Sequence, residues 1–178
     1  AGVIQAGFFN SPFSYTTPVI CPVEEDSFSG AYLTTQIAPG IYGGNLVNPG
    51  PTGSGYSLTL YNRDTAVDAD GNGITAEAAE GESLSVTQRA FDGVYLANLG
   101  IGQPPNTFII DFICGEVTFP SQSTNLTCGG GITVGPPTGP NGTYDFMDDT
   151  TFDLNYTDDE TPDCAFGATQ ATLRFTKE

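Results

Sequence analysis

The chain is divided into short runs rich in Val, Ile, Thr, Tyr and Phe, separated by Gly, Pro and Asn. The residue types in these runs favour strands, and Gly and Pro mark the turns between them. The only helix-like stretch is 75–82, where Gly81 stops a run of Ala and Glu after at most about two turns. The pattern therefore predicts an all-β fold.

Several of the expected strands alternate between apolar and polar residues. Tyr56, Leu58 and Leu60 share one face of their run, and Leu173 and Phe175 share one face of theirs, which is typical of strands with one buried face. The run TFIIDFI is apolar on both faces apart from Asp111, which predicts a central strand. The expected strands are 1–9, 13–20, 30–37, 55–62, 83–89, 93–99, 106–113, 116–119, 150–157 and 170–176.

Eight to ten such strands joined by Gly/Pro turns predict an antiparallel β-sandwich or jelly roll. The Gly/Pro-rich segments 47–55 and 129–142 are expected to be long surface loops. The 178 residues fit an N-terminal extension, 1–12, followed by a single domain, 13–178.

The charge balance excludes several classes of function. The formal net charge is -17, from 4 Lys and Arg against 21 Asp and Glu. Nucleic acids and anionic membranes are bound through clustered basic residues, so we expect neither as a partner. The sequence also lacks an apolar run long enough to predict a membrane span. Because only 14% of residues are charged, we expect a neutral surface with a few acidic clusters.

The residue types support catalysis poorly. The chain has no His, which excludes Ser–His and Cys–His pairs, and four cations leave little to stabilise an oxyanion. Asp111 and Glu116 are candidate glycosidase carboxylates, but Trp is absent as a sugar platform. We therefore expect no enzyme, and a secreted hydrolase is the weakest of three hypotheses.

The four cysteines are Cys21, Cys114, Cys128 and Cys164. An even number without a CxxC motif or a His partner indicates two disulfides formed in an oxidising compartment. Of the three pairings we favour Cys114 with Cys128, which leaves Cys21 with Cys164 to close a loop of about 140 residues. The small first residue and the absence of a start Met lead us to expect a secreted chain whose signal peptide has been removed.

Three Asn-x-Thr sequons, at Asn125, Asn141 and Asn155, cluster in the last third of the chain. Each predicts a glycan on a surface loop, provided that the host glycosylates Asn. Their clustering supports a glycoprotein.

Residues 68–73 have the spacing D-x-D-x-N-G, in which alternate side chains of a tight loop turn oxygen ligands toward a Ca²⁺ ion. The stretch resembles the first half of an EF-hand-type calcium loop, which implies calcium at Asp68, Asp70 and Asn72. It departs from that loop where the bidentate carboxylate belongs, since Ala79 stands there. A plain turn between strands has the same composition, and both interpretations stay open.

A second acidic cluster lies near the C-terminus. Carboxylates in such a run could coordinate cations at a subunit junction, but a solvated loop is the commoner outcome and the one we favour. Its members are Asp145, Asp148, Asp149, Asp153, Asp158, Asp159, Glu160 and Asp163.

The segment 1–9, AGVIQAGFF, is uncharged and apolar on both faces of a strand, with Val3 and Phe9 on one face and Ile4 and Phe8 on the other. Such a strand suits insertion into a neighbouring sheet, and a head-to-tail contact of this kind generates fibres. Burying the four side chains would contribute on the order of 6–12 kcal/mol before entropy is deducted. An ordinary first strand in the chain's own sheet is the alternative.

Through this segment and its composition, the chain resembles in general plan the secreted strand-exchange pilus and fibre subunits of bacteria and archaea. The resemblance implies a structural subunit on or outside a cell that polymerises head to tail by inserting residues 1–9 into the next copy. The second hypothesis is a secreted, calcium-stabilised carbohydrate-binding or adhesion module, with Tyr32, Tyr42, Tyr56 and Tyr95 as sugar-stacking surfaces. We favour the filament subunit.

Overall fold

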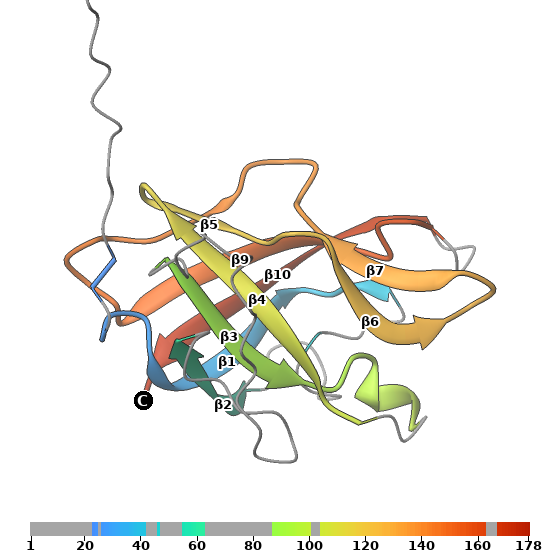
Figure 1. The fold of residues 1–178 in the computed structure, drawn as a ribbon, viewed down its shortest axis with the longest axis horizontal. Helices are drawn as coiled ribbons and strands as arrows, with labels where there is room; N and C mark the ends of the chain where they lie inside the picture. Colours follow the sequence, from blue (N-terminus) through green and yellow to red (C-terminus); the bar gives the residue numbers. More distant parts are fainter. Residues whose placement is uncertain are drawn as a thin grey trace, which may run out of the picture.

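A computed structural model describes residues 23–24, 26–41, 46, 55–62, 87–100, 104–162 and 167–178 (Figure 1). These residues form ten strands and a short 3-10 helix, Ala97–Leu99, which confirms the all-β prediction for the described part of the chain. The strands are β1 Gly30–Ala38, β2 Gly55–Asn62, β3 Gln88–Gly93, β4 Asn106–Ile113, β5 Glu116–Thr118, β6 Gln122–Thr127, β7 Gly131–Gly135, β8 Gly142–Thr143, β9 Thr151–Asp158 and β10 Thr169–Lys177.

The ten strands make one antiparallel sheet in the order β6-β7-β9-β10-β1-β2-β3-β4-β5-β8. The sheet turns over at β2, because β2 pairs with β1 over residues 55–60 but with β3 only through Tyr61 and Asn62. As a result the sheet curls, and β5 and β8 contact β9 although the three strands are far apart in the strand order (Figure 1).

The core lies inside the curl and is mostly aromatic. Alternation along β4 buries Phe108, Ile110 and Phe112. From the other half of the sheet, Phe152 and Phe175 stack with their ring centroids 4.6 Å apart. Aromatic pairs at such distances stabilise by about 0.5–1.5 kcal/mol beyond the area that they bury.

The strand β4 lies between β3 and β5, which confirms the predicted central strand, but only one of its faces is fully buried. The reason is that β5 covers only residues 111–113 of β4. Further along, the Gln122 side chain takes the place of a strand. Its Oε1 accepts from the Ile109 N–H at 2.7 Å and its Nε2 donates to the Ile109 carbonyl at 2.9 Å.

After Cys114 the chain returns along β4 and carries Cys128 to the opposite end of that strand. The Asn106 side chain donates to the Ser123 carbonyl at 2.6 Å and accepts from Asn125 at 2.9 Å, so β6 lies beside the start of β4. Cys114 is eight residues beyond Asn106 (106 to 114), or roughly 26 Å at about 3.3 Å per residue. A disulfide needs Cα atoms within about 7 Å, so the favoured Cys114–Cys128 bridge does not fit this fold.

Two other regions differ from the expected elements. Of the expected strand 93–99, only Gly93 lies in a strand, β3; residues 94–99 form a turn and the 3-10 helix, where Leu96 and Gly100 adopt left-handed backbone at φ 51° and 64°. Conversely, β7 and β8 form within 129–142, where we expected a loop. The expected strands 1–9 and 13–20 and the helix-like stretch 75–82 lie outside the described residues.

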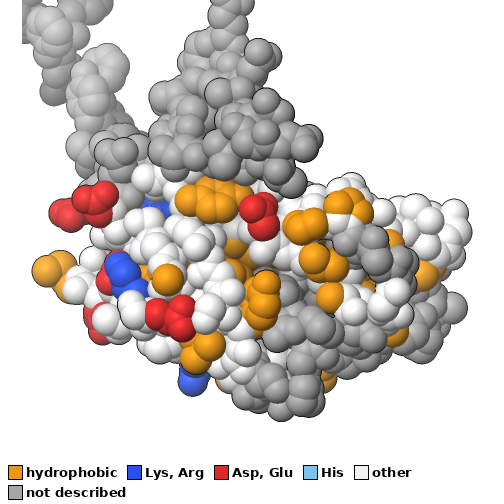
Figure 2. Space-filling view, turned by 90° about the horizontal axis from the view of Figure 1, so that it is seen from below, with side chains coloured by type: hydrophobic (Ala, Val, Ile, Leu, Met, Phe, Trp, Pro, Cys, Tyr) orange, Lys and Arg blue, Asp and Glu red, His pale blue; other side chains and the backbone are white. Residues whose placement is uncertain are grey.

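Among the described residues on the face seen in Figure 2, uncharged polar side chains and backbone predominate, with hydrophobic patches and scattered acidic and basic groups. Within the described ranges, no helix is both long and apolar enough to cross a bilayer.

Candidate functional site

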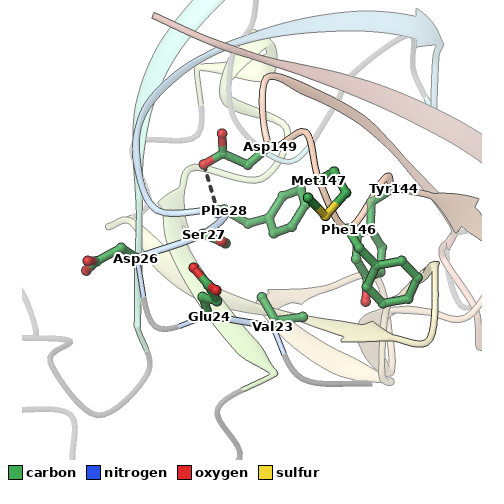
Figure 3. A pocket seen from close by; sticks show the side chains of 9 residues that line it. All are labelled: Val23, Glu24, Asp26, Ser27, Phe28, Tyr144, Phe146, Met147 and Asp149. Atoms are coloured by element: carbon green, nitrogen blue, oxygen red, sulfur yellow. Dashed lines mark hydrogen bonds between the residues drawn. The ribbon is translucent and has the colours of Figure 1, made fainter. Parts of the chain in front are cut away.

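A cavity of about 520 Å³ opens beside the first described residues (Figure 3). It has two walls, one from the segment before β1 and one from the loop before β9, which the fold brings together across 121 positions of sequence between Phe28 and Asp149. The first wall is made of Val23, Glu24, Asp26, Ser27 and Phe28, and the second of Tyr144, Phe146, Met147 and Asp149.

The first wall is a tight turn held by a buried aromatic ring. The Ser27 N–H donates to the Glu24 carbonyl at 3.0 Å and closes the turn. Phe28 then adopts a left-handed backbone at φ 54°, which costs on the order of 1–3 kcal/mol for a side chain of this kind. Its buried ring offsets this cost by stacking on Phe112 with the centroids 4.5 Å apart.

Arg89 fixes the first wall to the sheet. Its guanidinium is buried, and it donates to the Ser27 carbonyl through Nε at 2.9 Å and Nη2 at 2.7 Å, and to the Glu24 carbonyl through Nη2 at 2.9 Å. Hydrogen bonds to a charged donor contribute about 1.5–3 kcal/mol, so this contact determines where the turn lies on β3.

The second wall is a turn built by two aspartates. The Asp145 carboxylate accepts from the Met147 N–H, and the Asp148 carboxylate from the Thr150 N–H, each at 2.9 Å. The side-chain and backbone hydrogen bonds from Thr150 hold the pKa of Asp148 below its ordinary value. This turn presents Phe146 and Met147 at its tip, where they are 49% and 93% exposed.

Tyr144 joins the tip of this turn to the core. Phe146 packs edge-on against its ring, with the centroids 5.0 Å apart. Tyr144 is only 7% exposed, and its hydroxyl has no hydrogen-bond partner among the described residues. A buried hydroxyl in this state costs about 1–3 kcal/mol. The cavity therefore presents exposed apolar side chains beside a buried aromatic ring, which suits an apolar peptide segment.

The polar rim of the cavity is held in place by Asp149. Its carboxylate accepts from the Phe28 N–H at 3.3 Å and forms an ion pair with Lys177, while its backbone carbonyl accepts from the Tyr32 hydroxyl at 2.7 Å. The described residues include no group of three or more His, Cys, Asp or Glu side chains placed to hold a metal ion. The contacts of Asp149 with Phe28, Lys177 and Tyr32 thus hold the polar rim in a fixed position.

A separate buried carboxylate, Asp158, ends β9. Its Oδ1 accepts from the Tyr95 hydroxyl at 2.5 Å and its Oδ2 from the Ile41 N–H at 2.8 Å. Burial raises the pKa of Asp158, although these hydrogen bonds oppose the rise. The neighbouring Asp159 is also buried. The solvated loop that we expected is therefore wrong for these two residues, and the contacts of Asp158 indicate a structural role.

The structure describes only part of the predicted site. The predicted site residues that lie outside the described ranges are Cys21 and Cys164, the donor-strand residues Val3, Ile4, Phe8 and Phe9, and the calcium-ligand candidates Asp68, Asp70 and Asn72. Cys114 and Cys128 are described, and both are disulfide-bonded.

The three sequon asparagines lie in different surroundings. Asn125 is exposed on β6, and the Asn141 side chain, just before β8, donates to Glu116 at 2.9 Å. Asn155 lies within β9, paired with Thr172 of β10, rather than in the surface loop that we expected.

Two of the four sugar-stacking tyrosines of the adhesion hypothesis are unsuited to that role. Tyr32 and Tyr95 are buried in the core, so the expectation that they stack on sugars is wrong. Tyr56 is exposed, and Tyr42 lies outside the described residues.

Sequence reasoning missed Phe146 and Met147, because they stand within the acidic run and carry no periodic pattern. The available signal was the string DFMD, in which two aspartates that favour turns enclose two large apolar residues.

No protein-family model matches the chain, and no curated protein or solved structure matches it significantly. The support for a function therefore comes from the cavity and the sequence.

Proposed function

We propose that the chain is a structural subunit of an extracellular filament, in which residues 1–9 of one copy insert into the cavity of the next. The observation that carries this proposal is the exposed apolar surface of Phe146 and Met147 at the cavity. Residues 1–9 have the complementary chemistry, since they bring bulky apolar side chains and no charged side chain.

The position of the cavity at an edge of the sheet supports a strand as its occupant. The sheet order ends at β8, and Tyr144 directly follows β8. The edge of a sheet offers unpaired N–H and C=O groups, and a strand added there gains backbone hydrogen bonds as well as side-chain burial. An occupant of the cavity would lie beside such an edge.

The donor segment and the acceptor cavity are different surfaces of the same chain. Each copy therefore offers one of each, and a contact of this heterologous type extends into a fibre unless its rotation closes a ring. Association costs an estimated 4–15 kcal/mol, comparable to the roughly 6–12 kcal/mol from the four apolar side chains, so backbone pairing along β8 has to contribute.

In this proposal the two halves of the curled sheet serve as the layers of the predicted sandwich. The subunit is secreted, and its two disulfides are formed in an oxidising compartment. Glycans on the sequons and calcium at Asp68, Asp70 and Asn72 remain predictions.

Deleting residues 1–9 tests the proposal directly. We expect the truncated protein to lose all polymers in negative-stain micrographs while it keeps the urea midpoint of the intact subunit. A synthetic peptide AGVIQAGFF should then bind the truncated protein in a calorimetric titration. Polymers that persist after the deletion would contradict the proposal.

A matched pair of variants locates the binding site of this peptide. Phe146→Glu places a charge in the apolar cavity and should weaken peptide binding at least tenfold. Leu99→Glu adds the same charge to a side chain of similar exposure, 44% against 49%, in the 3-10 helix, and should leave binding unchanged. Equal binding by both variants would place the strand elsewhere.

The alternative, an ordinary first strand in the chain's own sheet, makes the opposite prediction. In that case the full chain stays monomeric at every concentration in sedimentation velocity. The deletion then lowers the urea midpoint of the monomer, since an internal strand has been removed.

A further inference from the structure

We propose that the two disulfides are Cys21–Cys114 and Cys128–Cys164, the third of the three pairings and not the one favoured from the sequence. Cys114 and Cys128 are both disulfide-bonded, and they lie at opposite ends of β4. Figure 1 shows the turn between β4 and β5 and the turn between β6 and β7 on opposite sides of the molecule. The partner of each is therefore one of the two remaining cysteines.

The described residues just before Cys164 lie close to Cys128. The Glu160 N–H donates to the Thr133 carbonyl at 2.9 Å, and the Thr161 hydroxyl donates to the Gly131 carbonyl at 3.2 Å. Gly131 is paired across the sheet with Thr127, the residue before Cys128. Cys164 follows Thr161 by three residues, a reach of at most about 11 Å, which is enough to meet Cys128.

In the same way, the described residues just after Cys21 lie close to Cys114. Val23 lines the cavity together with Tyr144 and Phe146. The Tyr144 N–H donates to the Gly115 carbonyl at 3.0 Å, and a Cβ placed on Gly115 would lie 3.6 Å from the Phe146 ring. Gly115 is the residue after Cys114. Cys21 precedes Val23 by two residues, so its Cα lies at most about 7 Å from that of Val23.

A second contact fixes Glu24 at the same end of β4. Arg89 donates to the Glu24 carbonyl at 2.9 Å, and Arg89 is paired with Ile110 in the second half of β4. Three residues of chain, at most about 11 Å, cannot carry Cys21 from there past the start of β4 to Cys128. The alternative pairing, Cys21–Cys128 with Cys114–Cys164, would need both short segments to cross the length of the sheet.

Each bridge forms by the loss of two protons and two electrons from a pair of thiols as their sulfur atoms join. The electrons pass to a disulfide of a thiol–disulfide oxidoreductase of the oxidising compartment, which is reduced to a dithiol. Two such exchanges give the four bonded cysteines.

The Cys21–Cys114 bridge would anchor the N-terminal segment to the body of the subunit beside the cavity. In a filament, tension on residues 1–9 would then reach the sheet through a covalent bond at Cys114. This consequence rests on the proposed function, whereas the connectivity itself does not.

Peptide mapping of the native protein tests the connectivity in one digestion. Cleavage after glutamate, with thiols blocked in mildly acidic buffer, separates all four cysteines, because glutamates 24, 25, 82, 116 and 160 lie between them. We expect the peptide ending at Glu24 or Glu25 to be linked to 83–116, and 117–160 to be linked to 161–178. A link between 83–116 and 117–160, a link between the N-terminal peptide and 117–160, or four unlinked peptides would each overturn the proposal.

Paired substitutions provide an independent readout. The variant with Cys21→Ser and Cys114→Ser should show no reactive thiol in denaturant, since one complete bridge is removed. The variant with Cys21→Ser and Cys128→Ser should show two, from Cys114 and Cys164. Equal thiol counts in the two variants would overturn the assignment. A non-reducing denaturing gel shows whether the links lie within one chain, and this result is independent of filament formation.

Discussion

Asp158 is a buried carboxylate whose pKa is raised by burial, against the hydrogen bonds from Tyr95 and Ile41. The folded state therefore binds the proton more tightly than the unfolded chain does. Lowering the pH from neutrality toward the unfolded pKa, about 3.9, should stabilise the fold through this group, and the gain should disappear as the pH rises again through the folded pKa.

Asp158→Asn removes this titration. The free energy of unfolding of the wild type, relative to the variant, should increase between pH 7 and pH 4 by about 1.4 kcal/mol for each unit by which the pKa is raised. Urea midpoints of both proteins at a series of pH values measure this difference. If the difference stays constant with pH, Asp158 does not titrate in this way.

At the residue scale, the sequence is informative about which side chains are buried in regular strands. Leu58, Leu60, Leu173 and Phe175 are buried as their alternation predicts, whereas Tyr56, expected on the same face as Leu58 and Leu60, is 43% exposed. It is uninformative about Arg89, Asp158 and Asp159, which are buried although charged. Their burial depends on carbonyl and amide groups supplied by distant turns, and the alternation within one strand cannot reveal such partners.

At the scale of elements, β8 is pressed against β9 at Gly142. A Cβ at this position would lie 1.7 Å from the Asp153 carbonyl oxygen, which belongs to the backbone of β9. Gly142→Ala therefore has to push the two strands apart, and we expect it to lower the free energy of unfolding by about 1–3 kcal/mol. Because Tyr144 follows β8, the variant should also weaken binding of the peptide AGVIQAGFF.

Gly139→Ala, three residues before β8, is the matched control. A Cβ at Gly139 would meet no atom within 4 Å, so this variant should stay within about 0.5 kcal/mol of the wild type in urea unfolding. Equal losses in both variants would show that the close contact between β8 and β9 is not the cause.

The expected bounds of β2 and β4 agree with the structure, those of β1 and β5 differ by one residue at one end, and those of β9 and β10 differ by one residue at both ends. These strands carry long alternating or apolar runs. By contrast, β6, β7 and β8 are short and rich in Gly, Thr and Asn, so their own residues give little signal. They are strands because neighbouring strands pair with them, and that information is not local.

At the scale of the whole molecule, the path of the strands through the curled sheet determines which distant residues lie close together, and sequence spacing does not reveal this. Cys114 and Cys128 are close in sequence, yet β6 runs back along β4 and separates them. In the same way, the segment before β1 meets the loop before β9 because both strands pair with β10 and start at the same end of the sheet. The all-β class could be predicted from residue types, whereas these long-range meetings depend on the order of strands in space.

The net charge of -17 and the calcium hypothesis make separable predictions for the whole chain. Self-repulsion opposes the compact state, so NaCl up to about 0.15 M should raise Tm by screening. A calcium site at Asp68, Asp70 and Asn72 should in addition make Tm higher in CaCl2 than in MgCl2 at the same concentration. At a calcium concentration of a hundred times the Kd, binding should add about 2.7 kcal/mol to the free energy of unfolding.

Asp70→Asn should abolish the difference between calcium and magnesium while leaving the response to NaCl unchanged, because it removes one ligand but only one of 21 acidic side chains. Differential scanning fluorimetry of the wild type and the variant in the three salts measures both effects. Equal Tm values of the wild type in CaCl2 and MgCl2 would identify residues 68–73 as a plain turn, and the response to salt would then come from the charge of the whole surface.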